Sequence, residues 1–364
     1  MQPSDGSRTM TRRGLLAGSG AALWAQTAPA PVRLGRRIRV AIAGFDGHYG
    51  EILEPLPQLP DVEIAAVCDA DPRVLERMAR RPALARARRY TDLERMLDAE
   101  QPDLVAVCNN NGERAAAILA CARRRIHVIA EKPLAIERRS LEEVKQSVAQ
   151  SGIQLSMLLP MRFSPPYLAI KRIVESGEIG EVAQIGAQKS YKAGRRPEWM
   201  TRRATYGGTI PWIGIHMVDL MRWTSGREFV ETAAFQARVG FPELGDMENT
   251  TAALFRLDNQ GVASLRMDYF RPETAPTHGD DRLRLAGTRG VVEYQQATGV
   301  TVVSSARKPE TLRELPPPGS VFVDFVESLY AGKPRQLTLE DIYRVNEIVL
   351  VAREAAEKRA VLPL

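Results

Sequence analysis

The chain has 364 residues, of which 44% are hydrophobic, and this length predicts two domains that each bury a core. Lys and Arg total 50 against 44 Asp and Glu, giving a net charge of +6, and much of this excess lies near the N-terminus. Further along the chain arginines alternate with acids, and aromatic residues are not interleaved with basic ones. We therefore expect a solvated surface and no nucleic-acid partner.

The first 30 residues are expected to be a targeting segment and not part of the fold. Arg12 and Arg13 open a mildly apolar stretch that continues to Trp24 and is followed by small residues. This pattern resembles a Tat export signal, and the stretch is shorter than the roughly 20 residues that a membrane span needs. It predicts an exported protein, periplasmic or extracellular, without a membrane span, or a cytoplasmic one if the signal is not used. A disordered tail with a chance arginine pair is the alternative.

Cysteine and histidine usage predicts neither disulfides nor a metal centre. Cys68 and Cys108 end apolar strand-like runs and Cys121 lies in a helical pattern, which are positions typical of buried free thiols. The sequence has four His in all and no C-x-x-C motif or His/Cys cluster, so no metal site is expected.

Residues 37–69 read as strand, turn, helix and strand. An apolar β-branched run ends at Gly44, and a second one ends at Asp69, which is 25 residues later. In a dinucleotide-binding unit the first glycine makes a tight turn, and an acid about 20 residues on accepts from the adenosine ribose. Asp69 favours NAD over NADP, because a carboxylate repels a 2′-phosphate. The predicted cofactor contacts in the turn are Gly44, Phe45, Asp46, Gly47, His48 and Tyr49.

The glycine pattern of this turn is imperfect. The glycines fall at Gly44, Gly47 and Gly50, not in the spacing G-x-G-x-x-G, and Asp46 places a carboxylate where the pyrophosphate comes closest. Pro55 is expected to end the following helix early. A structural turn that binds nothing is the alternative.

Residues 37–158 alternate between apolar strands and helical segments, as a parallel α/β domain does. Helical patterns cover 71–81, 93–97 and 112–125, and strands cover 103–108, 126–130 and 155–159. Ligands lie at the carboxyl ends of parallel strands. We therefore predict an NAD(P)-binding Rossmann domain over 37–158, with further cofactor contacts at Asn109, Asn111, Glu131 and Lys132.

From about residue 159 the pattern becomes rich in strands. We predict an α+β domain over 159–335 with a mostly antiparallel open sheet, followed by a C-terminal helix over 336–364. A half-covered sheet needs a partner for its other face, so a homo-oligomer, either a dimer or a tetramer, is expected. The predicted strands are 181–191, 229–239, 250–257, 262–269, 283–285, 291–294 and 300–304.

Four segments resemble the Gfo/Idh/MocA family of NAD(P)-dependent oxidoreductases. They are the strand that ends in the asparagines 109–111, HVIAEKPLA from His127, GIHMVDLMRW from Gly214, and the C-terminal stretch from Phe322. The resemblance, which covers about residues 37–362, implies that Lys132 is a catalytic lysine beside the nicotinamide. Burial would lower the pKa of its ammonium toward neutrality, where proton transfer is efficient.

The resemblance also implies that His216 shares the acid–base work with Lys132. Helical periodicity over 209–225 places His216 and Asp219 on one face, where Asp219 would orient the substrate or the imidazole. Trp212 stands where many family members carry an aspartate, and its ring could stack on the C–H face of a sugar. The predicted substrate contacts are Tyr191, Trp199, Trp212 and His216, and Arg162 completes the predicted cofactor contacts. Packing is the alternative for both tryptophans.

These features predict an oxidoreductase that transfers hydride between NAD and a hydroxyl or carbonyl of a sugar-type substrate. The cell envelope has no pool of soluble nicotinamide, so an exported enzyme is expected to hold NAD(H) tightly and to reoxidise it within one cycle or with a second substrate. A lyase or glycosidase that oxidises its substrate transiently is one alternative. A ligand-binding relative without turnover is the other.

Overall fold

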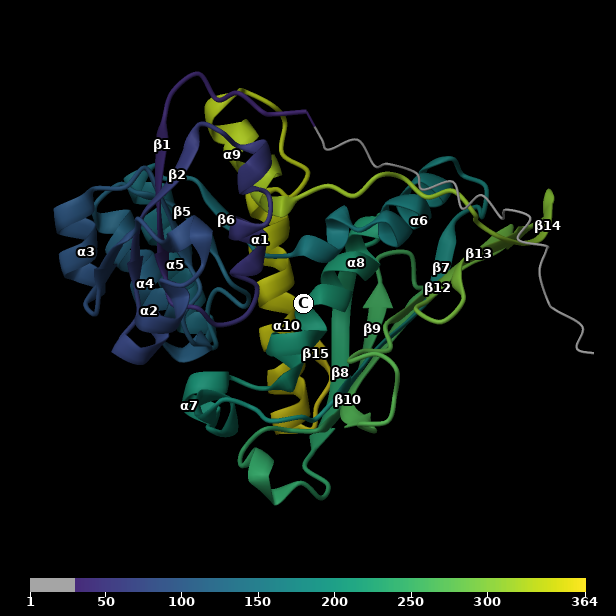
Figure 1. Cartoon of the computed structure of the whole chain (residues 1–364). Helices are drawn as coiled ribbons and strands as arrows, with labels where there is room; N and C mark the ends of the chain where they lie inside the picture. The colour runs from purple at the N-terminus through teal and green to yellow at the C-terminus, as the bar shows by residue number, and fades with distance from the viewer. Residues whose placement is uncertain (1–29) are drawn as a thin grey trace, which may run out of the picture. The chain divides into compact units, whose positions relative to one another are not determined.

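The computed structural model describes residues 30–364, and residues 31–364 form one compact unit. The predicted Tat-type signal over 1–30 lies outside the described residues, apart from its last position. Two β-sheets, here called A and B, organise the described chain (Figure 1). Among the described helices, none is long and apolar enough to cross a bilayer. The same residues contain no cluster of three or more His, Cys, Asp or Glu suited to a metal ion.

Sheet A confirms the prediction of a Rossmann-type parallel sheet. Its strand order is β3-β2-β1-β4-β5-β6, and every neighbouring pair runs parallel. The order reverses between β1 and β4, and at such a switch point the carboxyl ends of the strands leave a crevice for a ligand. The strands are β1 (Ile38–Ala43), β2 (Val62–Cys68), β3 (Arg88–Tyr90), β4 (Leu104–Val107), β5 (His127–Ala130) and β6 (Leu155–Met157).

The residues of sheet A suit a sheet that is covered on both faces. In β1, the sequence IRVAIA is buried at every position except Arg39, as expected of a parallel strand between layers of helices. Helix α1 is only four residues long, in agreement with the expectation that Pro55 ends it early. The helices of this part are α1 (Gly50–Leu53), α2 (Pro72–Met78), α3 (Leu93–Glu100), α4 (Asn111–Arg123) and α5 (Arg138–Ser151), of which α5 was not predicted.

Sheet B has nine strands in the order β14-β13-β12-β11-β7-β10-β9-β8-β15. Only β7 and β10 pair in parallel within it, so the prediction of a mostly antiparallel second sheet is confirmed. The edge strands β14 and β15 were not predicted. The strands are β7 (Val182–Lys192), β8 (Phe229–Ala237), β9 (Thr250–Leu257), β10 (Val262–Arg271), β11 (Arg282–Gly287), β12 (Gly290–Gln295), β13 (Gly299–Ser304), β14 (Arg307–Thr311) and β15 (Leu362–Pro363).

The long helix α10 (Leu339–Lys358) joins the two parts of the fold. It packs against α5 and β6 on the side of sheet A, and against α8 and β8 on the side of sheet B (Figure 1, yellow). The segment predicted as a C-terminal helix, 336–364, thus contains α10 followed by β15. The other helices of the second part are α6 (Pro165–Glu175), α7 (Arg203–Tyr206), α8 (Ile215–Ser225) and α9 (Val321–Tyr330).

The segment predicted as one helix over 209–225 is divided in two. A π-helical turn, η5 (Ile210–Gly214), precedes α8 (Ile215–Ser225). Pro211 lies in this turn and has no amide hydrogen to donate, which weakens regular α-helical bonding there. Such wide turns occur frequently at functional sites, and this one carries Trp212 and leads directly into His216.

Candidate active site

A pocket of about 450 Å³ opens at the carboxyl edge of sheet A, at the switch point between β1 and β4. Gly44 follows β1, Asp69 follows β2 and Asn109 lies just beyond β4, so the fold brings these three predicted cofactor residues together. The pocket is lined by Ala43, Gly44, Asp46, Cys68, Asp69, Ala70, Thr91, Leu93, Glu94, Asn109, Asn110, Glu113, Ala116, Ala117 and Ala120.

Gly44 lets the chain cross the end of β4 at close range. Its φ is +83°, and a Cβ built there would lie 2.6 Å from the Cα of Asn109. The amide of Asp46 donates to the carbonyl oxygen of Cys108 at 2.8 Å, which fixes the loop over the strand end. The side-chain Oδ1 of Asn109 is buried and has no hydrogen-bond partner among the described residues. A dinucleotide fits this pocket, because its hydroxyl and amide groups can donate to that oxygen.

The wall of this pocket is acidic. Burial is the main cause that raises the pKa of both Asp46 and Asp69. The carboxylate of Asp46 accepts a hydrogen bond from the indole Nε1 of Trp199 at 3.0 Å, and this contact ties the arginine-rich loop 192–205 to the turn after β1. An acidic wall suits ribose hydroxyls and disfavours an additional phosphate.

Glu131, at the end of β5, is buried beneath the same turn. It accepts from the backbone amide of His48 at 2.7 Å and from the His48 ring Nδ1 at 2.9 Å. Burial opposes its ionisation, but His48, Lys132 and Arg114 outweigh burial and lower the pKa of Glu131 to about 2. Gly47 must be a glycine here, because a Cβ would lie 2.6 Å from the Glu131 carboxyl carbon and its φ is +66°.

Lys132 follows Glu131 and is 2% exposed. Its Nζ donates to the carbonyl oxygen of Trp212 at 2.7 Å, lies 3.2 Å from the centroid of the Trp212 ring, and is 3.8 Å from Glu131 Oε1. Burial, together with Arg114 and Lys189, lowers the pKa of Lys132 to about 7, although the charge of Glu131 opposes this shift. The lysine is therefore poised to exchange a proton near neutral pH.

Arg114 holds the segment that carries Lys132, and sequence reasoning assigned it no role. Its buried guanidinium donates from Nη1 to the carbonyl oxygens of Lys132 at 3.1 Å and Pro133 at 2.8 Å. It also donates to the side chain of Asn111 at 2.8 Å, and Asn111 in turn donates to the carbonyl oxygen of Tyr206 at 2.7 Å. Asn111, on the first turn of α4, thus helps to hold the backbone segment that carries Lys132.

His216 lies at the start of α8 and is 4% exposed. Its ring makes an edge-to-face contact with the His48 ring, with centroids 5.2 Å apart, and its Nδ1 is buried without a hydrogen-bond partner among the described residues. Burial first, and then the charges of Lys132, Lys189 and His48, hold the pKa of His216 well below its usual value. The imidazole is therefore neutral and can accept a hydrogen bond or a proton.

A pocket of about 340 Å³ lies in front of His216 and His48, between the turn after β1, the start of α6 and sheet B. Tyr191, a predicted substrate contact, lines it together with Lys189 and Asp281, which sequence reasoning missed. The full lining is His48, Met161, Ser164, Pro166, Tyr167, Lys189, Tyr191, His216, Asp281, Tyr294 and Gln296. Nine of these eleven side chains, all except Met161 and Pro166, are polar, which suits a small polyhydroxylated ligand.

Asp219 and Arg162 form a buried ion pair with each other. Arg162 Nη2 and Asp219 Oδ1 are 2.6 Å apart, and Arg162 Nη1 also contacts Asp341 Oδ2 of α10 at 2.9 Å. Neither residue lines either of the two pockets described above. The structure thus places Asp219 on the predicted helix but directs it to Arg162, not to a ligand, and both side chains link α8 to α10.

The remaining predicted contacts lie at the margin of the site. Tyr49 contacts Phe45 edge-to-face at 5.4 Å, and its hydroxyl accepts from Arg81 at 3.2 Å. Trp199 and Trp212 pack edge-to-face at 5.4 Å, so the two tryptophans cover Lys132 and Asp46 and lie outside the lining of the 340 Å³ pocket.

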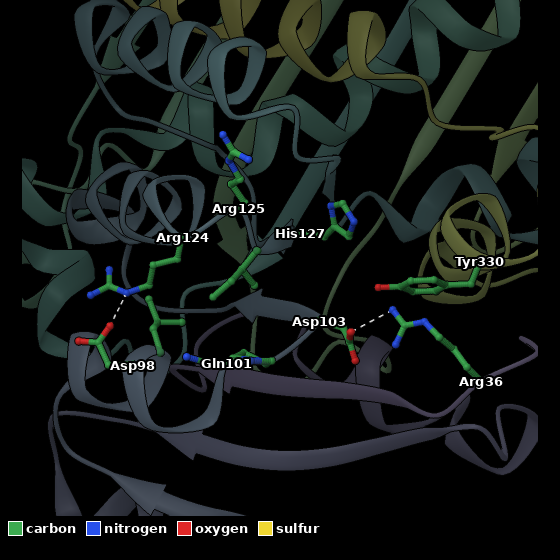
Figure 2. A pocket seen from close by; sticks show the side chains of 11 residues that line it. Arg36, Asp98, Gln101, Asp103, Arg124, Arg125, His127 and Tyr330 are labelled. Atoms are coloured by element: carbon green, nitrogen blue, oxygen red, sulfur yellow. Dashed lines mark hydrogen bonds and ion pairs between the residues drawn. The ribbon is translucent and has the colours of Figure 1, made fainter.

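A further pocket, of about 460 Å³, lies at the opposite edge of sheet A, where β4 and β5 begin (Figure 2). Its lining contains two charged pairs, which Figure 2 marks with dashed lines: Arg36 reaches Asp103 at 2.9 Å, and Arg124 reaches Asp98 at 2.7 Å. Its lining contains none of the predicted site residues.

Two family models match the chain. The model described as the oxidoreductase family with an NAD-binding Rossmann fold matches residues 38–158, and the model described as the GFO/IDH/MocA C-terminal domain matches residues 167–293. The first span covers sheet A, and the second covers β7 to β11 and the start of β12 in sheet B.

Individual proteins resemble the chain over most of its length. The myo-inositol 2-dehydrogenase of Thermotoga maritima is 24% identical over 267 residues, which are 73% of this chain and 78% of that protein. A solved structure from Thermotoga maritima is 30% identical with a TM-score of 0.84, and the match covers 90% of this chain and 100% of that one. The aldose-aldose oxidoreductase of Caulobacter crescentus, solved with glycerol, shares the fold with a TM-score of 0.78 at 21% identity, over 90% and 100% of the two chains.

Proposed function

Because this chain belongs to the Gfo/Idh/MocA family of oxidoreductases, with its NAD-binding Rossmann domain, we propose that it oxidises and reduces a polyol or sugar-type substrate. Hydride passes between a hydroxyl-bearing carbon of the substrate and a nicotinamide dinucleotide. The observation that carries the proposal is Lys132, a buried amine whose pKa is lowered to about 7 at the carboxyl edge of sheet A. The inositol dehydrogenases among the relatives support a substrate of this class.

Lys132 and His216 divide the proton transfer in this proposal. With a pKa of about 7, the Lys132 Nζ is neutral in an appreciable fraction of molecules at neutral pH and takes the hydroxyl proton as the substrate is oxidised. In the reverse direction the ammonium polarises the carbonyl oxygen and returns the proton. The Nδ1 of His216, which has no partner among the described residues, accepts from a substrate hydroxyl.

The cofactor in the proposal is NAD. Gly44, Asp69 and Asn109 would hold it in the 450 Å³ pocket, and when bound it supplies the acceptor and donor of hydride. Asp69 would accept from the ribose hydroxyls and repel the 2′-phosphate of NADP.

We also propose that the twin-arginine segment exports the folded protein with its cofactor in place. Outside the cytoplasm a reduced cofactor must be reoxidised on the enzyme, so one sugar or polyol would be oxidised and a second one reduced. An oxidoreductase named for an aldose donor and an aldose acceptor shares this fold, which supports the idea of a paired reaction.

Binding without turnover is the second candidate, and Asp46 favours it. Its carboxylate stands in the turn after β1, where the pyrophosphate of a dinucleotide would approach, and like charges repel there. A transient oxidation that serves a lyase or glycosidase reaction is a variant of the first candidate, with the same roles for Lys132 and His216.

The open face of sheet B supports the proposal of a homo-oligomer. Phe235 on β8 is 71% exposed, Leu254 on β9 is 53% exposed, and Val262 on β10 is 51% exposed. These side chains come from neighbouring strands, and large apolar side chains gathered on one face favour burial against a second copy.

Calorimetric titration of the purified chain with NAD and with NADP, after heat release and identification of any bound dinucleotide, tests the proposed function. We expect NAD either to be bound already or to bind in preference to NADP. Addition of myo-inositol or D-glucose to the loaded protein should then change the redox state of the bound cofactor. Binding of NAD without such a change for either probe would overturn the hydride-transfer proposal. Failure to bind either dinucleotide would also overturn it and would favour the second candidate, in which Asp46 repels the pyrophosphate.

A further inference from the structure

The sheet B wall of the 340 Å³ pocket contains a buried cation with two polar partners. The Nζ of Lys189, on β7, donates to the Tyr191 hydroxyl at 2.7 Å and to Asp281 Oδ2 at 2.9 Å. Lys189 is 1% exposed, and all three residues line the pocket. These contacts hold the pKa of Lys189 above its usual value even though burial opposes this, so the lysine is a fixed positive charge.

The wall offers both a donor and an acceptor toward a ligand. Because the Tyr191 oxygen accepts from Lys189, its own hydrogen remains available to donate. Asp281 uses Oδ2 for Lys189, and its buried Oδ1 has no hydrogen-bond partner among the described residues. A buried acceptor without a donor lowers the stability of the fold. A ligand hydroxyl that donates to Asp281 Oδ1 would supply the missing hydrogen bond and so favour binding. Neighbouring hydroxyls of a sugar or cyclitol supply both halves of such a contact.

The charges around the pocket are compensated within the protein. Lys189 is paired with Asp281, and His48 is paired with Glu131. The described lining residues include no arginine, the side chain that best binds phosphate or carboxylate in a fixed geometry. An anionic ligand would find no uncompensated fixed cation here. The pocket volume of about 340 Å³ is also small, near the lower end of ligand pockets, which run from about 300 to 1,000 Å³.

Resting on the proposed function, we propose that Lys189, Tyr191 and Asp281 determine the specificity of the substrate pocket. They select a single uncharged polyhydroxylated ring, a free monosaccharide or cyclitol, over phosphorylated, carboxylated or nucleotide-linked sugars. Asp281 accepts from one ring hydroxyl, Tyr191 donates to its neighbour, and Lys189 holds both side chains in place.

The test is calorimetric titration of the NAD-loaded full chain with four probes: myo-inositol, D-glucose, D-glucose 6-phosphate and D-glucuronate. We expect at least one uncharged probe to bind about tenfold or more tightly than either charged probe. Equal or tighter binding of a charged probe, or no binding of either uncharged probe, would overturn the inference.

Variants of Asp281 test the same wall from the protein side. Asp281→Asn leaves the Lys189 ammonium uncompensated, so affinity for the uncharged probe should fall about tenfold while affinity for D-glucuronate rises. If Asp281 only supported the fold, the substitution would not lower the affinity for the uncharged probe while raising the affinity for D-glucuronate. Tyr191→Phe removes one hydroxyl and keeps the ion pair between Lys189 and Asp281. It should lower the affinity for the uncharged probe and leave the affinities for the charged probes unchanged. The matched control is Asp280→Asn, since Asp280 pairs with Arg282 and lies outside the pocket lining.

The outcomes separate this inference from the proposed function. Unchanged probe affinities in Asp281→Asn and Tyr191→Phe, in protein whose melting temperature and NAD affinity match those of the parent, would overturn the role of this wall. If an uncharged probe binds as expected but the redox state of the cofactor never changes, the hydride-transfer proposal fails and the specificity assignment stands. Should both variants fail to fold, the four-probe titration of the parent protein decides.

Discussion

The ammonium of Lys132 lies 3.2 Å from the centroid of the Trp212 ring and donates to the carbonyl oxygen of the same residue at 2.7 Å. The two residues are 80 positions apart, so the contact joins the end of β5 to the π-helical turn before α8. A ring face favours the charged amine, whereas burial and the charges of Arg114 and Lys189 lower the pKa of Lys132 to about 7. An ammonium has three hydrogens, so donors remain for a substrate oxygen.

The pKa of Lys132 predicts the pH dependence of the reaction. Oxidation of a hydroxyl needs the neutral amine, which is present above a pKa of about 7 and is lost as the pH falls below it. The rate of oxidation should therefore drop about tenfold per pH unit on the acid side of neutrality. Rates measured across this range in the presence of saturating substrate check the expectation. A profile that is flat from pH 5 to pH 8, or one that falls as the pH rises through 7, contradicts it.

The buried pair of Arg162 and Asp219 should govern stability. Arg162→Met leaves the carboxylate of Asp219 buried without its partner and should lower the free energy of unfolding by about 3–5 kcal/mol. Replacing both residues, in Arg162→Met with Asp219→Leu, should recover much of that loss, because the buried carboxylate is then gone and Asp341, the other partner of Arg162, keeps Arg222 at 3.5 Å. Denaturant unfolding of the parent and the two variants measures this. If the single variant is as stable as the parent but inactive, the pair has a catalytic role.

Much of the fold could be predicted from the sequence, because buried parallel strands appear as short apolar runs and Gly44 marks the turn after β1. Three elements were missed: β14 is a polar edge strand, β15 has two residues, and α5 is a 14-residue helix whose buried residues Leu141, Val144 and Val148 recur at helical spacing. At the site, Gly44, Asp69 and Lys132 stand at strand ends that can be counted from the sequence. The Lys189 and Asp281 pair joins residues 92 apart, one on β7 and one just before the neighbouring strand β11, and local periodicity does not predict such a contact.

Asp69 sets the choice of dinucleotide in this account. Asp69→Ser removes the carboxylate beside the expected position of the ribose, so affinity for NAD should fall about tenfold and NADP should bind more tightly than it does to the parent. Calorimetric titration with both dinucleotides measures the change, and Glu76→Gln, on the exposed side of α2, serves as the control. If Asp69→Ser keeps the parent's preference for NAD over NADP, another residue determines that preference.

Phe235 tests the proposed oligomer. Phe235→Asp puts a charge in the middle of the apolar face of β8, β9 and β10, and an interface that buries it should dissociate. Light scattering coupled to size exclusion should show a larger assembly for the parent and a smaller one for the variant. The control is Arg86→Asp, on the exposed surface of the first domain. A parent protein that is monomeric at every concentration rejects the interface.

The most direct test of the central claim is a single turnover of the NAD-loaded protein, followed by the absorbance of reduced nicotinamide after mixing with excess myo-inositol or D-glucose. The account predicts reduction in the parent protein and a rate about 10²- to 10⁴-fold lower in Lys132→Met, with normal rates in Lys308→Ala, a variant of an exposed lysine on β14. A Lys132→Met protein that binds NAD and substrate and reduces the cofactor at the parent rate would contradict the claim that Lys132 carries the proton.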